Sequence, residues 1–352
     1  APLGIAVGWL AGWVVQPILW VAELGAGLPA AAWSTRTDIG SLILIGLGCL
    51  AASLAAPMVL SRRWASGLLV AVLLVASGQP RPAFGWPGAW SAVFCDVGQG
   101  DTTVLRAGDG QAVLVDTGPL PDSAVKCLRS VGVQRVPLLI LTHYHADHIG
   151  GLDRVLAEFA VEQVLVSRLP SPVAAARNVV ESVTRAGAQM REATPGERYR
   201  VGEVSWTTIW AGEKSPVMES DDDPIESVTE NDASIIAIAE IKGLRLLLPG
   251  DAEIDGQQAG MRSAAALGLS LRAQVLKLPH HGAARQDPDF FAASGAVLAV
   301  ASSGRNNDYG HPSPRTLGLA ARCGMQVSRT DLEGSLAVSL GPERIEVRSR
   351  GP

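Results

Sequence analysis

The chain has 352 residues, of which 47% are hydrophobic and 18% are charged, and its formal net charge is −5 at pH 7. This composition excludes a disordered or fibrous protein, and at roughly 150 residues per domain the length indicates about two domains. The mildly acidic balance argues against a strongly basic nucleic-acid clamp, so any nucleic-acid partner must be inferred from a specific site.

The N-terminal part has the composition of a membrane domain. Residues 1–78 carry only five charged side chains, and residues 41–60 form an uncharged apolar stretch of 20 residues, long enough to cross about 30 Å of hydrocarbon. A shorter apolar stretch follows at 64–78, and seven of the nine tryptophans lie in the first 90 residues, as in the aromatic belts of membrane interfaces. The alternative, core helices of a large soluble protein, accounts less well for two successive uncharged stretches.

The orientation and the boundary of this segment follow from a few residues. The pair Arg62 and Arg63 indicates a cytoplasmic loop, so we expect the chain after Gly78 to emerge on the outer side of the membrane. Because the chain starts without an initiator methionine or a basic leader, we expect it to be an internal part of a longer polytopic protein. A Gly- and Pro-rich linker at 79–90 then separates the membrane segment from a second domain, residues 91–352.

Short β-type stretches and helical stretches alternate beyond the linker. The expected strands are 91–97, 101–106, 111–115, 138–142, 163–166, 204–210, 234–240, 243–248, 274–278, 296–301, 325–329, 335–339 and 343–347. The expected helices are 122–131, 147–158, 172–187, 252–267, 287–294 and 313–322. Mixed strands and helices in this order predict a layered α/β sandwich, with sheets inside and helices outside.

The four cysteines argue against a disulfide scaffold. Cys49, Cys95, Cys127 and Cys323 are widely spaced and contain no C-x-x-C pair. Cys95 alternates with two valines in an apolar stretch, so we expect a buried strand residue with a structural rather than a reactive role.

All six histidines fall in three places, each after a predicted strand. The first group, His143, His145, Asp147 and His148, follows the apolar strand 138–142. Four donors within six residues suit a binuclear metal site, with two imidazoles for one ion and a carboxylate plus an imidazole for the next. The alternative, surface histidines at a helix start with Asp147 as the cap, requires one such residue and not four.

Three further histidines and an aspartate follow other strands. Asp251, after the apolar strand 243–248, is the candidate to bridge two ions, and its alternative role is a simple cap of the helix 252–267. His280 and His281 follow the strand 274–278, and His311 lies in a loop after the strand 296–301. Binding sites are usually assembled on such loops. A lone His-Pro is typical of a turn, so the case for His311 depends on the other histidines.

Two turns carry additional carboxylates. Residues 96–101 contain Asp101, and residues 116–118 begin with Asp116. Alone, both are ordinary turn signals. At the same edge of the sheets as the histidines, these side chains would orient the ligating imidazoles.

Together these motifs resemble the metallo-β-lactamase superfamily, and more narrowly its ComEC branch, the DNA-internalisation proteins of natural transformation. The motifs are DVGQGD from 96, DTG from 116, LTHYHADHIGGL from 141, PGD from 249, LPHHG from 278, YGHPSP from 309, and Thr330-Asp331-x-x-Gly334. The resemblance covers nearly all of 91–347, and residues 1–78 are similar to the end of the competence domain. It implies a four-layer αββα sandwich preceded by a short transmembrane α-helical segment. The location it implies is the cell membrane, with several spans and the hydrolase domain on the extracytoplasmic side.

The resemblance also implies two divalent metal ions, zinc or manganese, with magnesium as an alternative. His143 and His145 would hold the first ion, Asp147 and His148 the second, and Asp251 would bridge them. The remaining ligand positions would fall to His281 and His311, which we do not rank. The implied catalytic residues are His143, Asp147 and Asp251, with Asp147 orienting a hydroxide. The residues expected to orient ligands or contact the substrate are Asp101, Asp116, Asn231 and His280.

The chain departs from the family pattern at two positions. Many members carry a histidine between the first group and the bridging aspartate, whereas the turn 229–234 here contains Asn231 and Ser234. The first ion position therefore lacks a ligand unless a carboxylate or amide replaces it, which would shift the preference from zinc toward manganese or magnesium. Ala283 stands where the ComEC branch often has serine, which would remove one hydrogen bond to the substrate.

The implied function is a membrane-tethered nuclease that degrades the non-transported strand during DNA uptake. Its substrate would be single-stranded DNA, and its partners the bilayer and other proteins of the competence machinery. One alternative is a metallohydrolase of small phosphodiesters or lactones, because a fold does not determine a substrate. A second is a non-catalytic domain that guides DNA. The acidic segment 213–232 is expected to be a solvated linker.

Overall fold

The computed structural model describes Leu47 and residues 86–213, 229–342 and 344–351. The chain divides between Phe84 and Gly85. Apart from Leu47, the predicted membrane stretches lie outside the described residues, as do residues 79–85 of the predicted linker. Within the part that is described, no helix has both the length and the apolar character needed to cross a membrane.

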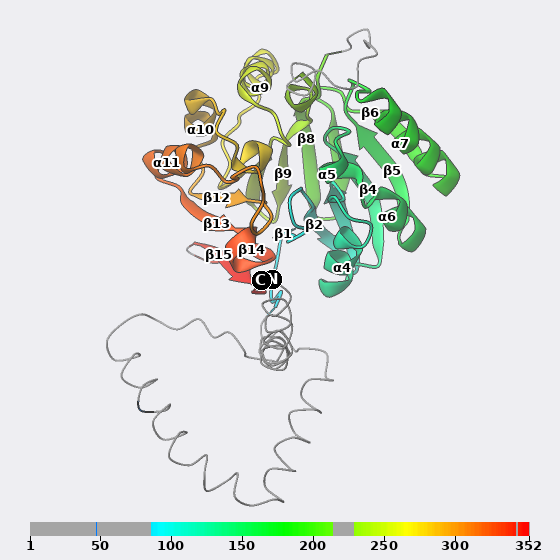
Figure 1. The fold of residues 1–352 in the computed structure, drawn as a ribbon, viewed down its shortest axis with the longest axis horizontal. Helices are drawn as coiled ribbons and strands as arrows, with labels where there is room; N and C mark the ends of the chain where they lie inside the picture. Colours follow the sequence, from blue (N-terminus) through cyan, green and yellow to red (C-terminus); the bar gives the residue numbers. More distant parts are fainter. Residues whose placement is uncertain (1–46, 48–85, 214–228, 343, 352) are drawn as a thin grey trace, which may run out of the picture. The chain divides into compact units, whose positions relative to one another are not determined.

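Two mixed sheets form the centre of the domain (Figure 1). The order of the eight-stranded sheet is β15 (Ile345–Ser349), β14 (Leu336–Leu340), β1 (Ala92–Phe94), β2 (Thr103–Gly108), β3 (Gln111–Val115), β4 (Arg135–Leu141), β5 (Ala160–Val166) and β6 (Gln189–Glu192). The order of the seven-stranded sheet is β13 (Gln326–Arg329), β12 (Leu298–Ala301), β11 (Val275–Lys277), β10 (Leu244–Leu248), β9 (Ile236–Ile241), β8 (Val204–Trp210) and β7 (Arg198–Val201).

Helices cover the outer face of each sheet. The helices on the first sheet are α4 (Ser123–Ser130), α6 (Leu152–Glu158) and α7 (Val173–Ala186), and those on the second are α9 (Ile254–Ala266), α10 (Pro288–Ser294) and α11 (Pro314–Arg322). Strand β4 shows how alternation builds the layers. Leu138 and Ile140 are in the core between the sheets, whereas Leu139 and Leu141 pack with the helices. The described domain is therefore a four-layer αββα sandwich, as predicted.

The candidate site lies at the carboxyl ends of parallel strands. Strand β3 pairs in parallel with β4, and β10, β11 and β12 form a second parallel set. Because parallel strands point the same way, the loops that follow them meet at one edge of each sheet, where α/β proteins commonly bind ligands. Asp116 follows β3, His143 follows β4, Asp251 follows β10 and His281 follows β11.

The predicted elements differ from the structure in a few places. Strands β6 and β7 were not predicted; the sequence of β6 is polar and all four of its residues are exposed, so it has no hydrophobic alternation to detect. The predicted helix 147–158 is two helices, α5 (Ala146–Ile149) and α6, separated at Gly150 and Gly151. A Cβ atom on Gly151 would lie 2.3 Å from the Thr117 carbonyl oxygen, so this close approach requires glycine.

One disulfide corrects the cysteine interpretation. Cys95, directly after β1, is bonded to Cys127 in α4, with a Cα–Cα distance of 6.0 Å. Cys95 is fully buried, as expected, but it is not a free structural thiol. The two cysteines are 32 residues apart, and they meet because α4 packs on the outer face of the first sheet. Sequence spacing alone contains no signal for that tertiary contact.

Candidate metal centre

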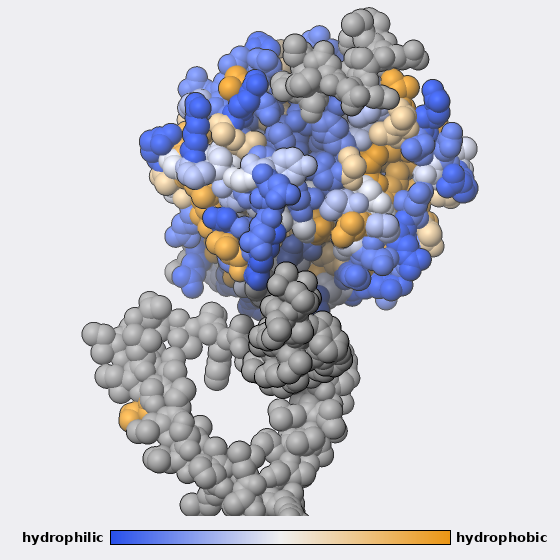
Figure 2. Space-filling model, in the orientation of Figure 1, coloured by the Kyte–Doolittle hydropathy of each residue, from blue (hydrophilic) through white to orange (hydrophobic). Residues whose placement is uncertain are grey.

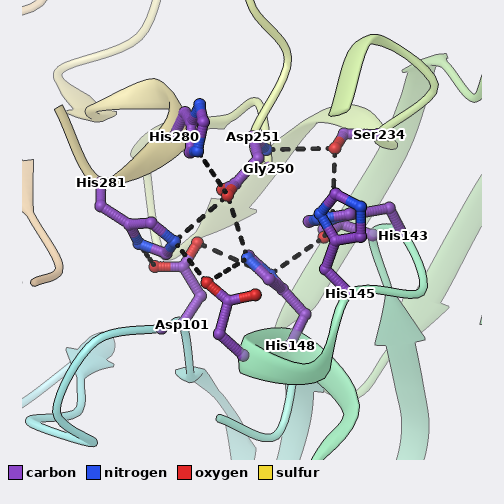
Figure 3. A network of polar contacts seen from close by, with 12 residues as sticks. Asp101, His143, His145, His148, Ser234, Gly250, Asp251, His280 and His281 are labelled. Carbon is purple, nitrogen blue, oxygen red and sulfur yellow. Dashed lines mark hydrogen bonds and ion pairs between the residues drawn. The ribbon is translucent and has the colours of Figure 1, made fainter. Parts of the chain in front are cut away.

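The first histidine group lies where β4 ends and α5 begins. His143 and His145 follow the strand, and the rings of His143 and His145 lie 4.6 Å apart, centre to centre. Asp147 and His148 belong to α5, whose cap position is His145 and not Asp147. The His143 and His148 rings are 4.1 Å apart. The short helix thus places the His148 ring beside the His143 ring (Figure 3).

Asp251 enters the site from the opposite sheet. It follows Gly250, whose φ of 57° is in the left-handed region and whose added Cβ would lie 2.8 Å from the Ser234 Cβ atom. The Asp251 amide donates a hydrogen bond to the Ser234 hydroxyl oxygen at 3.1 Å. The turn therefore requires glycine, and Ser234 fixes the backbone from which the Asp251 side chain enters the site.

His280 and His281 enter from a 3₁₀ turn, η1 (Pro279–Gly282), after β11. Both residues have positive φ angles, 47° and 54°. Such angles are costly for a residue with a Cβ atom and are found where the surrounding structure enforces a functional geometry. The strained turn directs the two rings to different sides of the Asp251 carboxylate, as Figure 3 shows.

Four donors converge on a small volume. Asp251 Oδ2 lies 3.1 Å from His148 Nε2 and 3.1 Å from His281 Nε2. Asp147 Oδ2 lies 3.1 Å from His281 Nε2 and 3.8 Å from His148 Nε2. Donors around one tetrahedral zinc ion are separated by roughly 3.3 Å, given bond lengths near 2 Å. Asp147, His148, Asp251 and His281 therefore form a set that could hold a metal ion.

Four of the imidazoles have a polar partner on one ring nitrogen, which leaves the other ring nitrogen for an ion. His148 Nδ1 lies 2.8 Å from Asp116 Oδ2, and His281 Nδ1 lies 2.9 Å from the Ser302 carbonyl oxygen. His145 Nε2 lies 2.6 Å from Glu230 Oε2, and His280 Nδ1 lies 2.9 Å from Glu253 Oε1. Metal-binding histidines show this arrangement, because a partner on one nitrogen selects the tautomer that presents the other to the ion.

The charge balance of the cluster is consistent with cation binding. Burial disfavours protonated His148, but the carboxylates of Asp251 and Asp147 outweigh it and raise the pKa of His148 well above its usual value. The same balance, with Asp251 and Asp101, raises the pKa of His281. Burial and the neighbouring His148 lower the pKa of His143. A metal ion at the cluster would thus displace protons from His148 and His281, so metal binding would strengthen as the pH rises.

Two buried imidazole nitrogens indicate whether the residues of the cluster suit a metal ion. His143 Nε2 is shielded from solvent and has no hydrogen-bond partner among the described residues, and His148 Nε2 faces the carboxylates of Asp251 at 3.1 Å and Asp147 at 3.8 Å. Buried polar atoms normally have a partner, and an orphaned atom in a native structure requires an explanation. One unpaired imidazole nitrogen and one that faces two carboxylates fit a divalent cation, so the donor set agrees with the implied metal.

Lys277 is a charged member of the cluster that sequence reasoning missed. Its side chain is only 4% exposed. The ammonium group contacts Asp101 Oδ2, the Gly250 carbonyl oxygen at 2.9 Å and Asp251 Oδ1 at 3.3 Å. These contacts overcome the effect of burial and raise the pKa of Lys277. The signal was available, because Lys277 is the one charged residue in the stretch 274–278 and a buried lysine needs a paired carboxylate.

The four residues predicted to orient ligands or contact the substrate lie in different places relative to the donor set. Asp116 contacts His148, as expected of an orienting carboxylate, and Asp101 contacts both Lys277 and His281. His280 lies at the edge of the cluster, with Nε2 3.9 Å from Asp251 Oδ2. Asn231 is 4% exposed and its side-chain oxygen has no partner. In the described part of the chain, no hydrogen bond links the Asn231 side chain to the donor cluster.

His311 lies outside the four-donor set. Its ring is 5.3 Å from the His280 ring and 6.2 Å from the His281 ring, and its Nδ1 lies 3.4 Å from Gln99 Nε2. Burial and the two neighbouring histidines lower its pKa to about 4. Between the two candidates that the sequence left unranked, the geometry brings His281 to the donor set.

A groove adjoins the site on the side of His145. It has a volume of about 430 Å³ and is lined by residues that include Tyr144, His145, Ile149, Pro172 and Val179. Figure 2 shows that the visible face is mostly hydrophilic, with hydrophobic residues gathered around α5 and α7. The groove offers an apolar surface next to an imidazole of the candidate site.

The comparisons with known proteins agree with this geometry. The family model "Metallo-beta-lactamase superfamily" matches residues 95–286, more than half of the chain. "ComE operon protein 3" of Bacillus subtilis is 26% identical over 261 residues, which are 68% of this chain and 32% of that protein. "Competence protein ComA" of Neisseria gonorrhoeae is 27% identical over 350 residues, which are 97% of this chain and 44% of that protein.

The chain thus spans less than half the length of these relatives, and the predicted resemblance to ComEC-type competence proteins is confirmed. The solved metallo-beta-lactamase fold protein YhfI from Bacillus subtilis aligns with a TM-score of 0.42 and 13% identity, over 68% of this chain and 96% of that one. With its two sheets, its strand-end histidines and the family match over residues 95–286, the chain belongs to the metallo-beta-lactamase superfamily.

Proposed function

We propose that the chain is a membrane-tethered, metal-dependent phosphodiesterase that degrades one DNA strand during DNA uptake. The observation that carries this proposal is the convergence of Asp147, His148, Asp251 and His281 within 3.1 to 3.8 Å. A divalent ion held there would supply a water molecule that ionises near neutral pH and would stabilise the leaving oxygen of a phosphodiester. The names of the relatives, both competence proteins, support DNA as the substrate.

The roles of the chain's own residues follow from their exposure. The Asp147 side chain is 32% exposed, whereas those of His148, Asp251 and His281 are at most 2% exposed. Asp147 is thus the donor that reaches the opening, where its carboxylate can accept a hydrogen bond from the attacking water. Asp251 and the imidazoles face inward and hold the ion. His143, with its unpaired Nε2, would contribute to a second ion position.

The proposed location is the outer side of a cell membrane. In this organisation residues 1–78 end a multi-pass membrane domain, 79–90 are a linker, and 91–352 are the hydrolase, working beside other competence proteins. The Cys95–Cys127 disulfide supports an oxidising compartment, because disulfides are rare in the reducing cytosol. The uncharged stretch 41–60 supports the membrane tether.

The groove beside His145 supports a substrate with a large planar group. Its volume of about 430 Å³ and its partly apolar lining, which also includes Asp153, Asn178 and Ser182, suit a nucleobase. A small lactone would leave most of this surface unused, so the groove favours single-stranded DNA over small esters.

The decisive experiment compares substrates and matched carboxylate variants. The full chain, purified in detergent with Mn²⁺ or Zn²⁺, is expected to cleave single-stranded DNA faster than bis-p-nitrophenyl phosphate or a lactone. Asp147→Asn is expected to lower the rate by roughly 100-fold or more, because it removes the group that orients the water. Asp109→Asn, the same change at a fully exposed position between β2 and β3, is the control and should retain the activity. Metal-loaded protein that leaves DNA intact, or full activity in Asp147→Asn, would refute the proposal.

A further inference from the structure

We infer that the two metal positions are unequal: one divalent ion binds tightly among Asp147, His148, Asp251 and His281, and the position beside His143 and His145 binds a second ion far more weakly. The inference rests on the proposed metal-dependent function and develops the missing ligand of the first ion position, which the sequence of the turn 229–234 indicates. Three features of the described residues carry it.

The tight position has a complete set of donors. Its two imidazoles and two carboxylates come from both sheets, and their donor atoms already have the spacing of ligands around one ion. The far nitrogens of both rings are held by Asp116 and by the Ser302 carbonyl oxygen, so little conformational freedom is lost when an ion binds. The position is preorganised for a cation.

The neighbouring position is incomplete. His143 offers one unpaired nitrogen, and His145, whose Nε2 is held by Glu230, offers only its Nδ1, so the position has two imidazole donors. In the described part of the chain, neither ring has a nitrogen within 4.0 Å of a carboxylate oxygen of Asp147 or Asp251, and neither belongs to a group of three or more donors. The side chain opposite His143 is Ser234, a neutral hydroxyl 3.3 Å from His143 Nδ1.

Lys277 strengthens the asymmetry. Asp251 turns Oδ2 toward His148 and His281, whereas its Oδ1 lies 3.3 Å from the Lys277 ammonium. A carboxylate that bridges two cations through separate oxygens presents one oxygen to each, and the ammonium charge beside Oδ1 repels a second cation there. The ammonium group thus occupies the side of Asp251 that such a bridge would use, and the carboxylate serves the tight ion.

Metal counting tests the inference independently of activity. The full chain is stripped with EDTA, titrated with Mn²⁺, and analysed for bound metal after dialysis, with electron paramagnetic resonance to separate free from bound Mn²⁺. We expect one ion per chain to bind tightly and a second to bind at a concentration at least about tenfold higher. Two ions that bind with the same affinity, or no ion bound to the folded chain, would overturn the inference.

Two matched glutamine variants assign the tight ion to its position. His281→Gln should abolish binding of the tightly bound ion. His143→Gln should leave the binding of that ion intact and should abolish binding of the weakly bound ion. Loss of the tight ion in His143→Gln would contradict the assignment. A Ser234→Asp variant adds a carboxylate opposite His143 and should raise the affinity for the second ion, with Ser130→Asp on α4 as the control. Thermal unfolding verifies that each variant folds. If Ser234→Asp does not fold, the two glutamine variants decide the question.

The outcome is separable from that of the proposed function. A chain that binds one tight ion but does not cleave DNA supports unequal positions and refutes the phosphodiesterase. A chain that cleaves DNA and binds two ions with equal affinity supports the phosphodiesterase and refutes the unequal positions.

Discussion

A single carboxylate, Asp116, fixes the orientation of the central imidazole. Its Oδ1 accepts a hydrogen bond from the Thr142 amide at 2.8 Å, and its Oδ2 accepts one from the Thr142 hydroxyl at 2.8 Å. The same Oδ2 lies 2.8 Å from His148 Nδ1. Thr142 therefore holds the Asp116 carboxylate in place, and the carboxylate in turn directs His148 Nε2 into the cluster.

We expect Asp116→Asn to lower the metal affinity of the tight position by roughly 10- to 100-fold, the usual effect of losing a partner behind a ligating histidine. The amide has nearly the same shape but removes the charge that favours the Nδ1–H tautomer of His148. Titration with Mn²⁺ or Zn²⁺ measures the affinity. The control is Asp122→Asn, the same change at an exposed residue paired with Arg154. An unchanged affinity in Asp116→Asn would exclude this orienting role.

At the scale of secondary-structure elements, the placement of α5 depends on how closely it approaches the loop after β3. The Gly151 amide donates to the Gly118 carbonyl oxygen at 3.1 Å, and the Thr117 amide donates to the His148 carbonyl oxygen at 2.7 Å. These bonds fasten the helix that carries Asp147 and His148 to the segment that begins with Asp116. The helix that carries His148 and the segment that carries Asp116 are therefore held in one arrangement by backbone hydrogen bonds.

We expect Gly151→Ala to destabilise the fold by about 1–3 kcal/mol and to weaken metal binding, because its Cβ would lie 2.3 Å from a backbone oxygen and push α5 away. The backbone is not the cause, since φ at Gly151 is −89°, a value that alanine adopts readily. The matched control is Gly318→Ala within α11, where the nearest atom lies at 3.5 Å. This control should be neutral or stabilising, because alanine favours helix. Thermal unfolding and metal titration of both variants decide the matter, and equal effects would refute the steric account.

At the scale of the whole molecule, the Cys95–Cys127 disulfide joins the inner layers to an outer one. Cys95 follows β1 and precedes the turn that carries Asp101, and Cys127 lies in the helix layer. The bond therefore links a segment that contributes to the site with the helices that cover the first sheet.

We expect loss of this bond to lower the stability of the domain by about 3–4 kcal/mol, from the chain entropy that a 32-residue loop regains in the unfolded state. Unfolding measured with and without a thiol reductant tests this, and thiol labelling verifies reduction. Cys323→Ser removes the free cysteine in the described residues and should leave the unfolding midpoint unchanged. A midpoint that does not respond to reduction would show that the bond contributes little.

Local sequence patterns determined the fold class and the principal donors. Continuous apolar runs predicted strands such as β3 and β10 within a residue or two, because a strand covered on both faces buries successive side chains. The strand-end positions of His143, Asp147, His148, Asp251 and His281 could be identified for the same reason, since a polar group directly after a buried strand lies at the edge of the sheet. Among the described residues, the departures from the prediction include the strands β6 and β7, the short helix α12 (Thr330–Glu333) and the glycine break between α5 and α6.

The tertiary structure alone decided how those donors are supported. Glu230 lies 85 residues from the His145 that it holds, and Lys277 contacts Asp101 from the opposite sheet. Such pairs arise when two sheets pack face to face, and the disulfide arises when a helix packs on a sheet, so no local spacing encodes them. The choice of His281 over His311, and the unequal metal positions that we infer, likewise depend on distances of a few ångströms between loops far apart in the chain. The sequence by itself thus determined the candidate donors, and packing determined which of them meet.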